Sequence, residues 1–145
     1  MRLLIVITIM LFSFTDAKAQ SLKQEVSNLR KGIASFYHNK FEGRKTATGE
    51  VFYNDKYTAA CNSMKLGTYA KVTNVSNGKV VYVRINDRMG HQGRAIDLTS
   101  LAATKLDFVK KGLANVKIEA VSAEEGKLGI LAQRNAELSE QKNTL

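Results

Sequence analysis

The chain has 145 residues and a formal net charge of +9, from 22 Lys and Arg against 13 Asp and Glu. This length suffices for one small domain, and no second folded domain is apparent. Its single cysteine, Cys61, excludes an internal disulfide, so the fold depends on its apolar core. The basic residues are scattered rather than clustered, so the charge gives only mild support for an acidic partner.

The N-terminus resembles a secretory signal. Arg2 precedes an apolar stretch from Leu3 to Phe14, and Ala17-Lys18-Ala19 has the small-x-small pattern of a cleavage site. The apolar stretch is shorter than the roughly 20 residues of a membrane span. We therefore expect a signal peptide at 1–19, no membrane anchor, and a mature protein in the periplasm or cell wall. An exported basic domain is expected to meet anionic cell-wall polymer rather than nucleic acid.

Apolar periodicity and turn residues predict the elements that follow a polar lead-in at 20–31. Asn77-Gly78 lies between two β-rich runs and is a strong hairpin signal. Asp97 is placed to cap a short helix, because its carboxylate can accept hydrogen bonds from free helix amides. The predicted elements are strands at 32–37, 69–75, 79–85 and 113–121, and a helix at 98–106.

Several short strands and one or two short helices within about ninety residues indicate a mainly β protein, a small closed barrel over 32–121. The last segment, 122–145, lacks aromatic residues and has only weak helical periodicity. We expect it to be weakly helical or disordered.

The stretch RINDRMGHQGRAID, residues 84–97, carries the strongest indication of function. An apolar strand delivers Asp87 into a glycine-containing loop, where a half-buried carboxyl is able to donate a proton. Glu50, at the end of a Thr-rich glycine loop, is the best second carboxylate. The pattern fits equally well with two carboxylates that only accept hydrogen bonds from their loops. The acidic residues of the predicted barrel are Glu42, Glu50, Asp55, Asp87, Asp97, Asp107 and Glu119.

Three segments together resemble the rare lipoprotein A (RlpA) family: GIASFYHNKFEGRKTATGEVF, YTAACNSMKLGTYAKVTNVSNGKVVYVRINDRMG and GRAIDLTSLAATKL. The resemblance implies a six-stranded double-psi β-barrel, as in barwin and the N-terminal domain of expansins. It also implies a lytic transglycosylase with Asp87 as the catalytic acid/base and Glu50 as the second acidic residue. Cys61 stands where the family usually has histidine.

The implied reaction cleaves the β-1,4 bond between N-acetylmuramic acid and N-acetylglucosamine in peptidoglycan and leaves a 1,6-anhydromuramyl end. It needs no metal or cofactor, and we expect a monomer. The alternative is a non-catalytic module of expansin type that binds or loosens cell-wall polysaccharide. The expected substrate-binding residues are Asn86, Arg88, Arg94, Tyr37 and Cys61.

Overall fold

The structure is a computed structural model, and it describes residues 16–23 and 29–144. Most of the predicted signal peptide at 1–19 therefore lies outside the described residues. Residues 16–23 form an exposed helix. Across the described ranges, no helix is both long enough and apolar enough to cross a bilayer.

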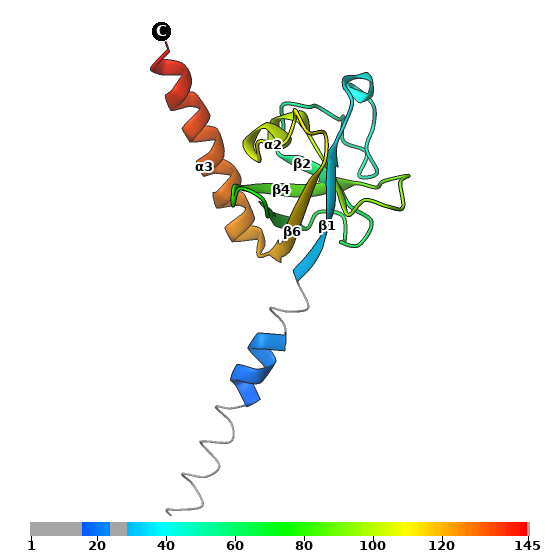
Figure 1. The fold of residues 1–145 in the computed structure, drawn as a ribbon, viewed down its shortest axis with the longest axis vertical. Coiled ribbons are helices and arrows are strands. Elements are labelled where there is room, and N and C mark those ends of the chain that lie inside the picture. The colour runs from blue at the N-terminus through cyan, green and yellow to red at the C-terminus, as the bar shows by residue number, and fades with distance from the viewer. Residues whose placement is uncertain (1–15, 24–28, 145) are drawn as a thin grey trace, which may run out of the picture.

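Six strands close into a barrel in the order β1-β5-β2-β4-β3-β6 (Figure 1). The pairs β1–β5 and β2–β4 are parallel, and the remaining neighbours are antiparallel. This confirms the expected mainly β barrel with few helices. The strands are β1 (Leu29–Phe36), β2 (Thr58–Ala60), β3 (Tyr69–Asn74), β4 (Val80–Asp87), β5 (Ile96–Leu98) and β6 (Ala114–Val121).

Alternation along the strands fills the barrel. In β4, Val81, Val83 and Ile85 are fully buried, while the residues between them are partly exposed. Successive side chains of a strand point to opposite faces, so these three point inward. Asn74, the last residue of β3, is a buried polar exception, and its side-chain amide donates to the carbonyl of Leu106 at 2.9 Å.

The predicted hairpin is confirmed, since β3 and β4 pair antiparallel on either side of the Asn-Gly turn. Gly78 has φ of 73°, in the left-handed region that favours glycine, and its N–H donates to the carbonyl of Asn74 at 2.8 Å. The Asn-Gly turn predicted from the sequence therefore sets the register of β3 against β4.

Two short helical segments, η1 (Asn39–Phe41) and α2 (Ser100–Lys105), join the strands. The expectation that Asp97 caps the second of these is wrong. Thr99 is the cap, and its side-chain oxygen accepts from the N–H of Ala102 at 3.3 Å. Asp97 lies within β5 and forms an ion pair with Arg94, so its carboxylate is already occupied.

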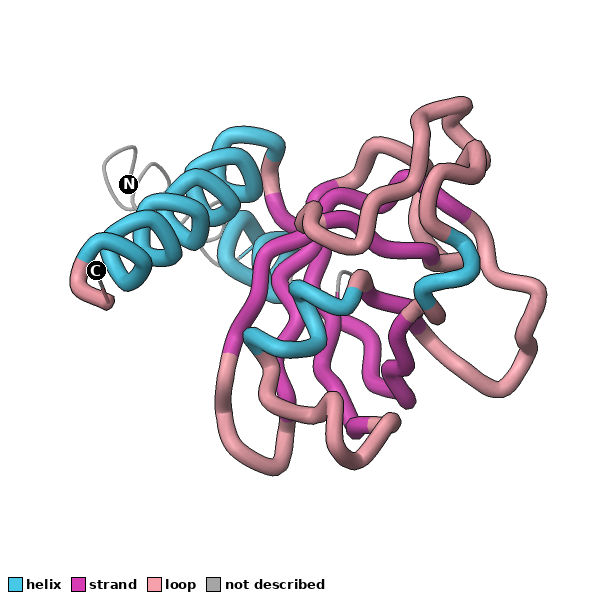
Figure 2. Tube along the Cα trace, turned by 90° about the horizontal axis from the view of Figure 1, so that it is seen from above, coloured by secondary structure: helices cyan, strands magenta, loops and turns pink. Residues whose placement is uncertain are grey.

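The C-terminal segment differs from the expected weakly helical or disordered tail. It forms the helix α3 (Ala123–Lys142), which runs along one side of the barrel (Figures 1 and 2). Ser122 caps the helix by accepting from the N–H of Glu125 at 3.1 Å. The sequence S-x-x-E is a capping-box pattern, and it was the available signal for this helix start.

Close packing against β3 and β4 orders α3 although the helix has few buried apolar residues. A Cβ on Gly126 would lie 2.2 Å from the Cβ of Tyr69, and one on Gly129 would lie 2.4 Å from the ring of Tyr82. Glycine allows this approach because it has no side chain. Because glycines make the contact, no apolar stripe marks it in the sequence.

A side-chain amide fixes the register of α3 on the barrel. The backbone N–H of Tyr82 donates to Oε1 of Gln133 at 2.6 Å, and Nε2 of Gln133 donates to the Tyr82 carbonyl at 3.1 Å. The strand β2 is too short to pair with this part of β4, and Gln133 satisfies the backbone groups there.

We expect Gly126→Ala to destabilise the protein. Alanine is favoured over glycine in a helix by about 1 kcal/mol, but overpacking against Tyr69 costs about 1–3 kcal/mol. Denaturant unfolding and protease sensitivity of the helix measure the effect. Ala136→Gly, at an exposed position of the same helix, calibrates the propensity effect alone. A stabilised Gly126→Ala variant would mean that α3 does not pack on the barrel.

Candidate active site

Asp87 lies at the end of β4, and three donors from three segments hold its carboxylate. Oδ2 accepts the hydroxyl of Tyr37 at 2.6 Å. Oδ1 accepts the backbone N–H groups of Ala47 at 2.9 Å and Arg88 at 2.8 Å. The pairing of β2 with β4 shifts register beside this point, between Ala59 and Ala60. Such irregularities re-aim a strand end, and here the carboxyl is fixed in one orientation.

Tyr37 is held by aromatic packing. Its ring centroid lies 4.4 Å from that of Phe52, with the planes tilted by 37°, and 5.9 Å from that of Phe41 in an edge contact. Burial raises the pKa of Tyr37, and the hydrogen bond to Asp87 raises it further. The phenol therefore stays protonated and donates to the carboxylate.

Glu50 forms a two-bond ion pair with Arg84. Nη1 of Arg84 lies 2.8 Å from Oε1 and Nη2 lies 2.5 Å from Oε2. The hydrogen bond from Arg84 is the main cause that lowers the pKa of Glu50, although burial opposes it. The same pair raises the pKa of Arg84. Glu50 is therefore ionised at neutral pH and is suited to a charge-stabilising role rather than to proton donation.

One turn connects the two carboxyls. In residues 46–50, the N–H of Ala47 binds Asp87, while the N–H of Thr48 donates to the carbonyl of Asn86 at 3.2 Å. Gly49 has φ of 84°, which returns the chain toward Glu50. The side chain of Asn86 is buried and contributes a hydrogen bond that lowers the pKa of Glu50. The structure thus brings Glu50, Asn86 and Asp87 to the same turn.

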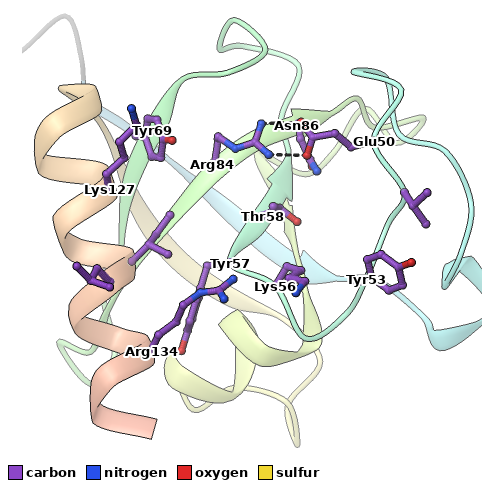
Figure 3. Close-up of a pocket in the computed structure, with 13 residues that line it drawn as sticks. Glu50, Tyr53, Lys56, Tyr57, Thr58, Tyr69, Arg84, Asn86, Lys127 and Arg134 are labelled. Atoms are coloured by element: carbon purple, nitrogen blue, oxygen red, sulfur yellow. Dashed lines mark hydrogen bonds and ion pairs between the residues drawn. The ribbon is translucent and has the colours of Figure 1, made fainter. Parts of the chain in front are cut away.

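A pocket of about 480 Å³ opens on the Glu50 side of this turn, between the barrel and α3 (Figure 3). The ion pair of Glu50 with Arg84 lies at one side, and Lys127 and Arg134 extend from α3 at the other. Asp87 does not line it. The lining residues are Glu50, Val51, Tyr53, Lys56, Tyr57, Thr58, Tyr69, Arg84, Asn86, Lys127, Ile130, Leu131 and Arg134.

Three of the residues expected to bind substrate have internal contacts. The guanidinium of Arg88 donates to the carbonyls of Cys61 and, at 2.7 Å, Met64. Arg94 binds Asp97, with 2.8 Å between Nε and Oδ1. Cys61 is fully buried within the apolar core, and its thiol lies 3.4 Å from the hydroxyl of Ser63. In this conformation the thiol does not reach the surface.

Arg84, Tyr57 and α3 belong to the site but were not predicted from the sequence. Arg84 had a signal, since it is a cation at an outward position between Val83 and Ile85 in an otherwise apolar strand. Tyr57 and the packing of α3 had no such signal, because the pocket that joins them exists only after the helix has packed on the barrel.

A protein-family model described as "Lytic transglycolase" matches residues 30–118. That range includes the whole turn at 46–50 and the end of β4. The chain belongs to this family. Its model stops before α3, so the pocket wall that α3 forms lies outside the match.

Curated relatives are similar to this chain in sequence. The chain is 43% identical over 105 residues to the endolytic peptidoglycan transglycosylase RlpA of Pasteurella multocida, covering 72% of this chain and 36% of that protein. It spans less than half of the length of the other leading relatives with that name.

Two solved structures share the double-psi β-barrel architecture. The Streptomyces papain inhibitor superposes with a TM-score of 0.54 at 18% identity, covering 65% of this chain and 94% of that one. A mutant expansin of Clavibacter michiganensis in complex with cellohexaose superposes with a TM-score of 0.53 at 19% identity, covering 65% of this chain and 50% of that one. These likenesses confirm the expected fold.

We expect Arg84→Gln to lower stability at neutral pH and to lose this effect in acid. The pKa of Glu50 is depressed below its ordinary value of 4.5, so the ion pair contributes fully above that pH. The contribution disappears as the pH falls through the lowered pKa of Glu50, because the protonated carboxyl no longer attracts Arg84. Denaturation midpoints between pH 7 and pH 2 measure the difference.

The control is Lys79→Gln, which breaks the exposed pair of Lys79 with Asp107 at 3.2 Å. An exposed pair contributes little at any pH. A stability difference for Arg84→Gln that persists unchanged at the lowest pH would contradict the assigned role of the Glu50 charge.

Proposed function

We propose that this protein is an exported lytic transglycosylase that cleaves the glycan strands of peptidoglycan. The observation that carries the proposal is the Asp87 carboxyl, fixed by Tyr37 and two backbone amides at the end of β4. It lies inside the segment matched by the lytic transglycolase family, and the named RlpA relatives support peptidoglycan as the substrate.

In the proposed mechanism, Asp87 serves in both steps. Its protonated carboxyl donates to the oxygen of the β-1,4 bond as the bond from that oxygen to the muramyl anomeric carbon breaks. The muramyl C6 hydroxyl then attacks the anomeric carbon, and its proton passes to the Asp87 carboxylate. The carboxyl is restored, no water is added, and the products are a free 4-hydroxyl and a 1,6-anhydro end.

Tyr37 and Glu50 have distinct roles in this proposal. A phenol hydroxyl both donates and accepts, so Tyr37 can stay bonded to Asp87 in either protonation state. Glu50 is kept ionised by Arg84 and supplies negative charge where the sugar ring becomes positive. Among the residues expected to contact substrate, Asn86 lines the pocket, but its side chain is buried and hydrogen-bonded to Glu50, so its role in this proposal is to position that carboxylate.

We expect Asp87→Asn to reduce the release of anhydromuramyl products by at least ~100-fold, the usual scale of acid–base catalysis. The amide keeps the shape of the side chain but cannot transfer the proton. Mass spectrometry of digested peptidoglycan measures the products, and Asp55→Asn, at an exposed residue in the turn before β2, is the control.

Undiminished product release by Asp87→Asn would show that another group is the acid. Binding of glycan by the wild type without any product would instead favour a non-catalytic module of expansin type.

We expect Cys61→Ser to lower stability but to leave the activity of the folded protein unchanged. The position is fully buried, so a hydroxyl there costs about 1–3 kcal/mol unless it is bonded. The nearby hydroxyl of Ser63 limits this cost. Thermal unfolding and product release per folded molecule separate the two effects. Lost turnover with an intact fold would assign the thiol a chemical role.

A further inference from the structure

The face of α3 that points away from the barrel carries an apolar stripe (Figure 1). Contacts to the barrel come from the inward face of the helix, through Gly126, Gly129, Gln133 and Glu137. Side chains on the opposite face are spaced alternately four and three residues apart, the spacing by which two helices pack along a common seam. This outward stripe consists of Glu124, Leu128, Leu131, Asn135, Leu138 and Lys142.

The three leucines of the outward stripe are exposed. Leu128 is 59% exposed, Leu131 is 54% exposed and Leu138 is 58% exposed. One exposed leucine on a protein surface is ordinary, but three along one helix face form a patch that a partner can cover. Leu131 also reaches the pocket beside Glu50, whereas Leu128 and Leu138 do not line it. The patch therefore extends well beyond that pocket.

The two ends of the outward stripe carry opposite charges. Glu124 lies in the first turn of α3 and Lys142 lies in the last. The ion pairs found among residues 16–23 and 29–144 include neither of them. If a second copy of the helix lies antiparallel along the stripe, Glu124 of each copy faces Lys142 of the other. A parallel pair would instead bring like charges together at both ends.

The apolar positions match in the same antiparallel arrangement. With the midpoint of the pair at Gln133, Leu128 of each copy faces Leu138 of the other, and Leu131 faces Asn135. The stripe is thus complementary to itself. Self-complementary surfaces are those by which two identical chains form a dimer with two-fold symmetry.

A shallow hollow of about 420 Å³ at the start of α3 is suited to the end of the second helix. Glu125 in this hollow accepts from the hydroxyl of Tyr82 at 3.2 Å, while Glu124 remains for a cation. In the antiparallel arrangement, Leu138 and Lys142 of the other copy lie at this hollow, and they supply an apolar group and a cation. The residues that line it are Tyr82, Ser122, Glu124, Glu125, Leu128 and Gly129.

Two side chains oppose this contact and keep it weak. Asn135 places an amide in the apolar seam, which lowers the stability of a helix pair. Arg134 of both copies lies on the same flank near the two-fold axis, where the like charges repel. The seam is also short, so we expect a buried area below about 1,200 Å², in the range of transient contacts. In favour of association, Gln133 already holds α3 on the barrel, so the helix is ordered beforehand.

We propose that the outward stripe of α3 binds the same stripe of a second copy of this chain, antiparallel and with two-fold symmetry. A weak, reversible dimer then replaces the monomer expected from the sequence. The two helices lie at its centre and the two barrels lie outside, because each helix keeps its inward face on its own barrel. Each dimer carries two copies of the site beside Glu50, and two linked sites bind a repetitive polymer with higher avidity.

Sedimentation of the purified protein over a range of concentrations tests the dimer. We expect half of the chains to be dimeric at about 0.1 mM, at the weak end of specific interfaces. Leu128→Gln/Leu138→Gln should weaken association at least about tenfold, because the apolar cover of the seam is lost. Glutamine is a good helix former, so the helix itself should persist.

The control is Leu66→Gln/Leu113→Gln, which changes leucines that are 38% and 51% exposed outside α3. It should associate as its parent does. A wild-type protein that stays monomeric well above the expected concentration would overturn the proposal. Equal association of the helix variant and the control would also overturn it.

Cross-linking through single added cysteines tests the orientation. Cys61 is buried, so Leu128→Cys and Leu138→Cys each add one accessible thiol. In the antiparallel dimer, like positions lie about 15 Å apart along the axis, whereas the two different positions face each other. A short bismaleimide should therefore cross-link a mixture of the variants but neither variant alone. Efficient cross-linking of each variant with itself would indicate parallel helices and overturn the proposal.

Exchange of the end charges gives an independent test. Glu124→Lys should weaken association several-fold, because it brings two lysines together at each end of the pair. Glu124→Lys/Lys142→Glu should restore association, since the ends are again complementary. A double variant that associates as weakly as the single one would contradict the pairing of these ends.

This inference does not rest on the proposed function. Association is measured without glycan, so its absence would leave the transglycosylase proposal intact. Absence of anhydromuramyl products from the wild type would refute that proposal and would not change the measured association.

Discussion

The site depends on the contact between the turn at 46–50 and the end of β4. The N–H of Ala47 donates to the Asp87 carboxylate, and the N–H of Thr48 donates to the carbonyl of Asn86. Glu50 is the last residue of the same turn. Arg84 of β4 also holds this turn in place, because its guanidinium binds both carboxylate oxygens of Glu50. Neither segment holds its carboxyl alone, so the barrel must close before the two acidic groups take up their positions.

Much of this arrangement was predictable because it depends on local chemistry. Alternating apolar residues marked β4 and β6, and Asn77-Gly78 marked the hairpin. The expected cap was wrong because Asp97 and Thr99 are both good capping residues. Arg94, a partner within reach of Asp97, could be recognised only in three dimensions. Comparison of the acidic residues and the family resemblance both indicate Asp87 and Glu50, and the structure adds their hydrogen-bond partners.

The least predictable part was α3. Helices that pack on a protein usually reveal an apolar stripe, but this one contacts the barrel through Gly126, Gly129 and Gln133. Each of those residues is a poor indicator of burial in a sequence. The pocket was therefore hidden as well, because one of its walls, with four of the thirteen lining residues, belongs to a helix whose packing no sequence pattern marked. The barrel supplies the family's fold, and α3 gives this chain a separate surface beside the acidic residues.

The bond between Gln133 and Tyr82 has a consequence for solution behaviour. Unpaired backbone groups along a strand edge are a template on which a second molecule can add a strand, and proteins commonly block such edges to remain soluble. Here one amide occupies the donor and the acceptor that β2 leaves open. Without α3, this donor and acceptor of Tyr82 would be unpaired at an open part of β4, where a strand of another molecule is able to bind.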